Sequence, residues 1–101
     1  MSITSTATVA TDRPERFAKQ LVTHLGRKVT WTTVGNASTG TFGTAAAGVA
    51  TDAESLTLTA TGKTDDEVAL VENVLGSHLE RFAFRHPVEI TWTRTTTEDI
   101  R

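Results

Sequence analysis

Two histidines at matching positions in two similar segments are the side chains in this sequence that could take part in the most kinds of chemistry. Residues 21–27 and residues 75–81 share leucine, histidine, leucine and arginine at the same offsets, and the histidines are His24 and His78. Both segments have a helical pattern, so the two imidazoles could approach each other if the helices pack side by side. An old duplication or chance would each explain the match.

Three interpretations of this histidine pair are open. In a structural one, each imidazole is partly buried and bonds to a backbone carbonyl or a neighbouring side chain. In a metal-binding one, His24 and His78 are two ligands and His86 is a third, but H-E-x-x-H, H-x-x-x-H and thiolate patterns are missing. In an anion-binding one, basic residues join the pair to hold a carboxylate or phosphate, although cations near helix C-termini already complement the helix dipole. Those basic residues are Arg27, Lys28, Arg81, Arg85 and His86.

Patterns for catalysis are weaker still. The sequence has no G-x-S-x-G elbow, and Ser77 and His78 are adjacent helical positions whose side chains diverge. The glycines within residues 35–43 do not form a G-x-x-x-x-G-K-[ST] phosphate loop. The sequence therefore assigns no catalytic residue, no metal ligand and no cofactor. A small enzyme that uses His24 and His78 as acid and base is the weakest of the functional alternatives.

Alternation of small or apolar residues with threonine predicts the strands. Residues 3–9, 29–34, 56–61 and 88–93 show this period of two, which is typical of strands with one buried face. A weaker strand is expected at residues 45–51, after a stretch rich in glycine and other turn residues.

Helical periodicity predicts two helices between these strands. The first is expected to begin at Asp12, with Glu15 as the partner in a capping box, and the second at Thr64, with Glu67 in the same role. Each then carries an apolar stripe along one side. Gly76 lies inside the second helix, where it costs about 1 kcal/mol relative to alanine and would let another segment approach closely.

The resulting order, β-α-β-β-β-α-β, predicts an α+β fold. We expect a two-layer sandwich in which two helices cover one face of an antiparallel sheet of about five strands. With 101 residues and no composition break, residues 1–101 are expected to form a single domain. The other face of the sheet would carry threonine, either as a solvated outer surface or as a docking or dimerisation surface.

Composition narrows the functional classes. The net charge of −2 argues against a nucleic-acid partner, because such proteins normally carry a positive excess. No stretch approaches the roughly 20 apolar residues that a membrane span needs, and the first residues do not resemble a signal peptide. The chain has no cysteine, which excludes disulfides and fits a reducing compartment. The expected location is therefore the cytoplasm.

Three runs of this sequence resemble a bacterial family called domain of unknown function 2218. They are RPERFAKQLVTHLGRK at residues 13–28, HLERFAFR at residues 78–85 and VEITW at residues 88–92. Some members of that family are joined to, or encoded near, siderophore-interacting flavoproteins that reduce ferric chelates. The family has no agreed active site, so the resemblance transfers no catalytic residue. It singles out six family-like positions as candidate ligand-binding residues: Gln20, His24, Lys28, His78, Arg81 and Arg85.

These observations together predict a small cytoplasmic binding or accessory domain without enzymatic activity, associated with iron–siderophore use. A small anionic ligand, a second copy of the chain and a siderophore-interacting flavoprotein are the expected partners. The alternative is a structural or interaction module that self-associates through the open sheet face or an edge strand.

Overall fold

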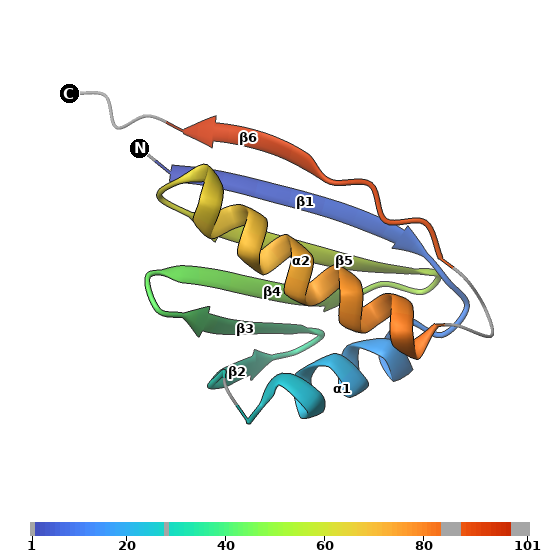
Figure 1. Cartoon of the computed structure of the whole chain (residues 1–101). Helices are drawn as coiled ribbons and strands as arrows, with labels where there is room; N and C mark the ends of the chain where they lie inside the picture. Colours follow the sequence, from blue (N-terminus) through green and yellow to red (C-terminus); the bar gives the residue numbers. More distant parts are fainter. Residues whose placement is uncertain (1, 28, 84–87, 98–101) are drawn as a thin grey trace.

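The computed structural model describes residues 2–27, 29–83 and 88–97 (Figure 1). Within them, a six-stranded antiparallel sheet with the strand order β2-β3-β4-β5-β1-β6 carries two helices. The elements in chain order are β1 (Ser2–Ala10), α1 (Pro14–Leu25), β2 (Trp31–Val34), β3 (Ala37–Phe42), β4 (Ala45–Thr51), β5 (Ser55–Gly62), α2 (Asp65–Phe82) and β6 (Thr93–Thr97). Within these ranges, neither helix combines the length and hydropathy of a bilayer crossing.

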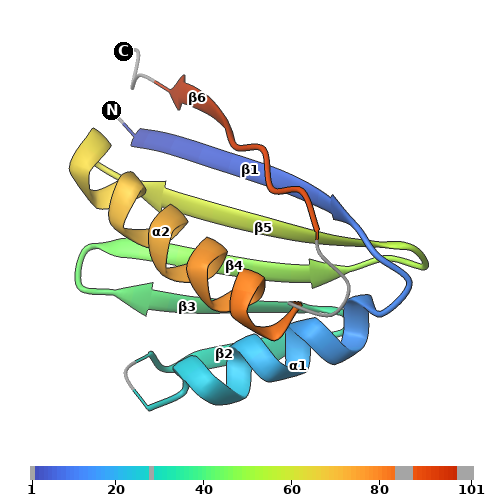
Figure 2. The ribbon, with the colours of Figure 1, turned by 45° about the vertical axis from the view of Figure 1, so that its right-hand side comes forward.

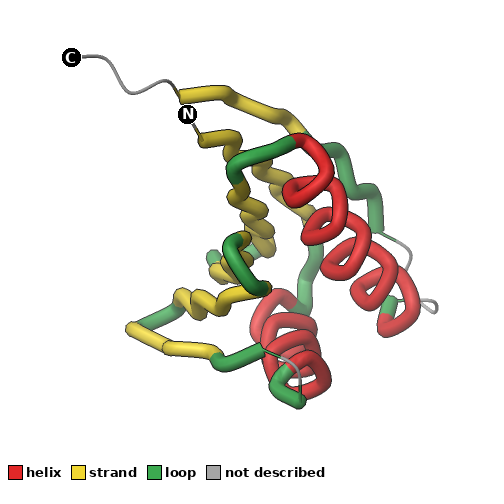
Figure 3. The backbone as a smooth tube through the Cα atoms, turned by 60° about the vertical axis from the view of Figure 1, so that its left-hand side comes forward, coloured by secondary structure: helices red, strands yellow, loops and turns green. Residues whose placement is uncertain are grey.

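Both helices lie on the same face of the sheet, as the sequence predicts (Figures 2 and 3). Burial alternates strictly along β5, and the same alternation marks the helix-facing residues of β1 and β4. The apolar stripes of α1 and α2 cover this face and form one buried cluster with it. The side chains at its centre are Val9, Leu21, Val49, Leu56, Leu58, Val68, Val71, Leu75 and Leu79.

The start of α2 confirms Thr64 as the predicted cap, but the second hydrogen bond of the capping box has a different donor. The Thr64 hydroxyl accepts a hydrogen bond from the backbone N–H of Glu67 at 3.2 Å. The Glu67 carboxylate accepts from the backbone N–H of Lys63 at 2.9 Å and from the Thr44 hydroxyl at 2.6 Å. The bonds from Thr44 and Lys63 lower the pKa of Glu67. Because Thr44 lies in the β3–β4 turn, the capping box also connects the start of α2 to that turn.

The start of α1 differs from the prediction. Arg13 occupies the N-cap position without a side-chain hydrogen bond, and Pro14 is the first helical residue. The hydroxyl of Thr11 accepts from the backbone N–H of Arg13 at 3.1 Å, so the turn before the helix is closed by Thr11 rather than by Asp12. Because proline has no N–H to satisfy and a φ suited to a helix, this start needs less capping.

The sheet has six strands rather than about five because β3 was not predicted. Its sequence, ASTGTF, has two small residues, a glycine and no β-branched apolar side chain, so it resembles a turn-rich stretch. The strand forms because it pairs with β4 along its whole length and with β2 over residues 37–40.

The last predicted strand, at residues 88–93, is also wrong in position. The strand that pairs with β1 is β6, and Thr93 is its first residue, opposite Thr6. Residues 88–92 have no regular secondary structure, although Val88, Ile90 and Trp92 are half-buried and alternate with exposed neighbours. The alternation does not come from strand pairing. It arises because these three side chains pack against the core cluster.

Gly76 is the point on α2 beside which Ile90 and Trp92 lie, but their approach does not require a glycine. A Cβ built at Gly76 would lie 3.9 Å from both Ile90 Cδ1 and Trp92 Nε1. That separation is an ordinary van der Waals contact, so the space beside the glycine can take a methyl group.

A cluster of charged side chains fastens β6 to α2. Arg94, directly opposite the small buried residue Ser5 of β1, donates to both carboxylate oxygens of Glu72 at 3.1 and 2.8 Å. It also donates to Asp65 at 3.2 Å. Glu72 is only 14% exposed, and the bonds from Arg94 lower its pKa.

We predict that Gly76→Ala raises the free energy of unfolding by about 0.5–1 kcal/mol, because alanine removes the entropic cost of a glycine inside a helix. Gly40→Ala is the matched control and is expected to destabilise the protein. A Cβ at Gly40 would overlap the side chain of Val29 and lie 3.0 Å from Trp31 Cε3. Urea denaturation of both variants measures the difference, and a destabilised Gly76→Ala would contradict the packing described.

We predict that Glu72→Gln lowers stability near neutral pH by about 1 kcal/mol, because it removes the charge that Arg94 pairs with. The Glu72 pKa in the folded protein lies below its ordinary value of 4.5, so the stabilisation is complete above that value. It is lost as the pH falls through the lowered pKa. Denaturation curves at several pH values should therefore converge for the two proteins in acid. A stability difference that does not change with pH would contradict this assignment.

Candidate functional site

The two helices bring His24 and His78 together. Their ring centroids lie 5.0 Å apart, with the ring planes tilted by 50°. The ring of Phe82 lies edge-on to His24, with centroids 5.6 Å apart. The contact arises because Leu21 and Leu75, one helical turn before each histidine, are both fully buried beneath the helices.

The two imidazoles have different environments. His78 is half-buried, and its Nδ1 lies 2.7 Å from the backbone carbonyl oxygen of Val74. A carbonyl oxygen only accepts, so Nδ1 of His78 carries a proton and donates it. His24 is exposed. The structural interpretation therefore describes His78 well, whereas the ring of His24 faces the solvent side of the pair.

A groove of about 500 Å³ runs along α1 in front of this pair. The lining residues that α1 and the turn after it contribute recur at intervals of three and four, so they share the side of α1 that faces away from the sheet. Phe82 of α2 completes the lining. We call this groove the α1 groove. Its residues are Arg16, Lys19, Gln20, Thr23, His24, Arg27 and Phe82.

The α1 groove has a positive electrostatic character. Arg16, Lys19 and Arg27 are exposed cations, and no carboxylate is among the lining residues that the structure describes. None of the ion pairs between described residues involves these three cations. The negative end of the α1 dipole is equivalent to about half a charge, so three full positive charges outweigh it.

Gln20 contributes an unsatisfied polar group to the same groove. Its Oε1 atom is buried and has no hydrogen-bond partner among the described residues. A buried polar atom without a partner costs about 1–3 kcal/mol. Since an amide offers donors on one side and an acceptor on the other, Gln20 can complement a ligand group of either kind.

The structure unites only part of the predicted set of ligand-binding residues. Gln20 and His24 line the α1 groove, and His78 stands directly behind His24. Arg81 is exposed on α2 and does not line the groove. The two other members, Lys28 and Arg85, lie outside the described residues, as does His86.

Sequence reasoning missed Arg16, Lys19, Thr23 and Phe82 as lining residues. The signal that could have found the first three is the helical period itself, because they lie on the side of α1 opposite its buried stripe. Phe82 could not have been found in this way. It belongs to the stripe of α2 and reaches the groove only because the helices meet.

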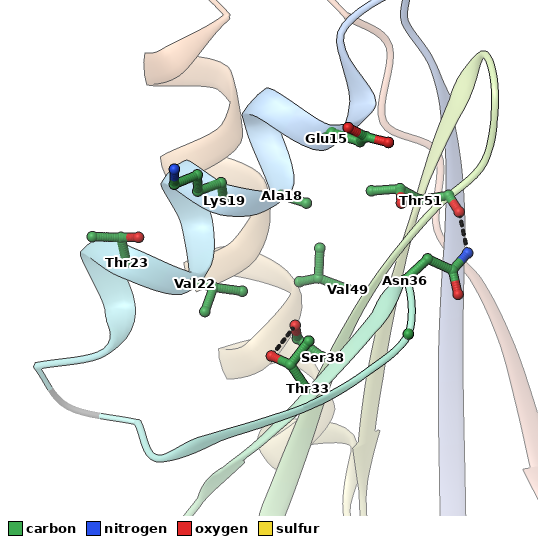
Figure 4. Close-up of a pocket in the computed structure, with 11 residues that line it drawn as sticks. Glu15, Ala18, Lys19, Val22, Thr23, Thr33, Asn36, Ser38, Val49 and Thr51 are labelled. Carbon is green, nitrogen blue, oxygen red and sulfur yellow. Dashed lines mark hydrogen bonds between the residues drawn. The ribbon is translucent and has the colours of Figure 1, made fainter.

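A second hollow, of about 400 Å³, lies on the other side of α1 against β2, β3 and β4 (Figure 4). It shares Lys19 and Thr23 with the α1 groove, but the Lys19 amino group points away from the floor of the hollow in Figure 4. Polar groups on its strand side are already engaged: the hydroxyls of Thr33 and Ser38 lie 2.9 Å apart, and the amide of Asn36 donates to the backbone carbonyl of Thr51. Glu15 adds a negative charge to the lining. This hollow is therefore less suited to an anion.

The metal-binding interpretation needs a third ligand beside the histidine pair. In the part of the chain that the structure describes, no group of three or more histidine and carboxylate side chains is close enough to hold an ion. Two imidazoles alone do not make a stable site.

We predict that His78→Ala destabilises the protein by about 1–2 kcal/mol, because it removes a hydrogen bond and half-buried packing. His24→Ala, at the exposed position, is the matched control and should cost less than about 0.5 kcal/mol. Urea denaturation of both variants checks this difference. Equal losses would show that the two imidazoles do not occupy the different environments described.

Comparisons with known proteins agree with the fold. The family model described as "Uncharacterized protein conserved in bacteria (DUF2218)" matches residues 6–93, so the chain belongs to this family, as the three sequence runs indicated. The NMR structure of PA4090 from Pseudomonas aeruginosa is similar, with a TM-score of 0.77 and 24% sequence identity over 90% of this chain and 95% of that chain. At that identity the likeness supports the fold alone. The search of curated proteins found no match.

Proposed function

We propose that this member of the DUF2218 family is a binding module that holds a small anionic ligand in the α1 groove. The observation that carries the proposal is the placement of His24, backed by His78, among three cations that have no acidic neighbour in the described part of the lining. Such a constellation lowers the free energy of a bound carboxylate or phosphate through several charge-assisted hydrogen bonds.

Each side chain has a distinct part in this binding. Arg27 and His24 lie near the C-terminal end of α1, and Arg16 lies near its beginning, so the positive charge extends along the helix. A ligand with two or more anionic groups fits this spread better than a single small ion. Gln20 lies midway along the groove and contributes a polar amide to its lining, and Phe82 supplies an apolar flank.

His78 has a supporting part. Its Nδ1 is held by the carbonyl of Val74, so its ring orientation is fixed. The ring of His24 rests against it and against Phe82. His78 thus positions His24, and the exposed imidazole makes the contact with the ligand.

The proposal extends to iron–siderophore use, which rests on the family resemblance and not on the groove. In that role, the domain would hold an anionic ferric chelate beside a siderophore-interacting flavoprotein. The positive groove supports this extension because carboxylate-bearing chelates are anionic.

We predict that citrate binds the protein measurably and that Arg27→Gln raises its dissociation constant about tenfold. Loss of one charge-assisted hydrogen bond, about 1.4 kcal/mol, accounts for that change. Isothermal titration calorimetry with citrate, and separately with inorganic phosphate, gives the constants. Ferric citrate tests the extension to iron chelates.

Lys63→Gln is the control because Lys63 is an exposed cation in the β5–α2 turn and does not line the α1 groove. It should leave the dissociation constant of citrate unchanged. If both variants weaken binding equally, the interaction depends on net charge alone and the proposed site is wrong. If citrate and phosphate both fail to bind the wild-type protein, the proposal of an anion site fails.

A further inference from the structure

Among the described residues, the face of the sheet that the helices leave open carries no charged side chain. Strand register places alternate residues of each strand on it. Of the 10 basic and 12 acidic residues in the sequence, none occupies these positions. The outward positions hold Ser2, Thr4, Thr6, Thr8, Ala10, Thr32, Val34, Ala37, Thr39, Thr41, Ala46, Gly48, Ala50, Ser55, Thr57, Thr59, Thr61, Thr93 and Thr95.

An open face without any charge is unusual for a surface that only meets water. The chain is 22% charged overall, and solvated faces usually carry much of that charge. Val34, on the same face, is 76% exposed and is one of two large apolar side chains that the described residues leave in solvent. Depletion of charge is the compositional mark of an interface core.

The centre of this face has a groove beside a ridge. The outward residues of β4 are Ala46, Gly48 and Ala50, and they form the floor of a hollow of about 250 Å³. The neighbouring strand, β5, presents a row of threonines, of which Thr59 and Thr61 line the hollow. The register places each threonine directly beside a small residue of β4. Groove and ridge therefore run parallel, one strand apart.

From this geometry we infer that the open face docks against the same face of a second copy. Three strands lie on either side of the line between β4 and β5. A two-fold axis parallel to the strands, above this line, places β5 of each copy over β4 of the other. The threonine ridge of each copy then enters the groove of its partner, which makes the contact isologous.

The area and the electrostatics of the open face fit a second copy of the chain. Six strands spaced about 4.8 Å apart, each with about six residues of about 3.3 Å, make a face of roughly 570 Å². Two copies would bury roughly 1,100 Å² in total, which is close to the lower end of about 1,200 Å² for a specific interface. An uncharged face is complementary to itself because no like charges oppose each other in the dimer. The dimer would be a sandwich of two sheets about 10 Å apart.

The test is the mass of the protein in solution, by sedimentation equilibrium up to about 100 μM, since an interface of this area is expected to be weak. The monomer mass is 10.9 kDa, and the wild-type protein should approach twice that value with rising concentration. A wild-type protein that stays monomeric over the whole range overturns the inference and leaves the face to a different partner or to solvent.

Thr59→Lys places two lysines near the two-fold axis, and its dimer dissociation constant should rise at least about tenfold. Thr59→Val, an uncharged change of similar size, should keep the dimer. If Thr59→Lys does not fold, Thr6→Lys tests the same face at an exposed position on β1. Asn73→Lys, on the exposed side of α2, adds the same charge away from the face. If Asn73→Lys weakens the dimer as much as a lysine on the sheet face does, the proposed interface is wrong. It is also wrong if neither Thr59→Lys nor Thr6→Lys weakens the dimer.

Discussion

The whole arrangement depends on the burial of both helices against one face of the sheet. Each strand of the central trio β4, β5 and β1 directs its large apolar side chains to the same side. The stripes of α1 and α2 are both apolar and can be buried only there, so the two helices share the face and touch each other. Fully burying each leucine or valine contributes about 1.5–3 kcal/mol, which outweighs any single polar contact at the surface.

This one constraint has two consequences for function. On the covered side, the leucines on the buried face of α1 and α2 fix the rotation of both helices, and His24 and His78 meet as a result. On the other side, the described strand residues are mostly small residues and threonines, and none of them is charged. The candidate ligand site and the candidate dimer face therefore lie on opposite layers. A ligand in the α1 groove would not compete with a second copy docked on the sheet.

The sequence was enough to predict the elements whose local pattern of residues matches the structure they form. β4, β5 and α2 match their predicted ranges closely because alternation, the apolar stripe and the Thr64 cap all agree. β3 could not be predicted since its stability comes from pairing with β2 and β4 rather than from propensity. Residues 88–92 alternate as a strand would, but that alternation serves packing against α2 and the core. For the site, the helical period indicated that His24 and His78 could meet, whereas the participation of Phe82 depends on how the helices cross.

The central claim is that the pair of imidazoles is one unit in which His78 holds His24 for a ligand. The most direct test is NMR of protein labelled with ¹⁵N in its histidine rings, recorded while citrate is added. Our account predicts that His78 is protonated at Nδ1 before and after the addition, and that the ring signals of His24 and His78 shift together along one binding curve. A His78 ring protonated only at Nε2, or a His24 signal that does not respond while citrate binds, would contradict it.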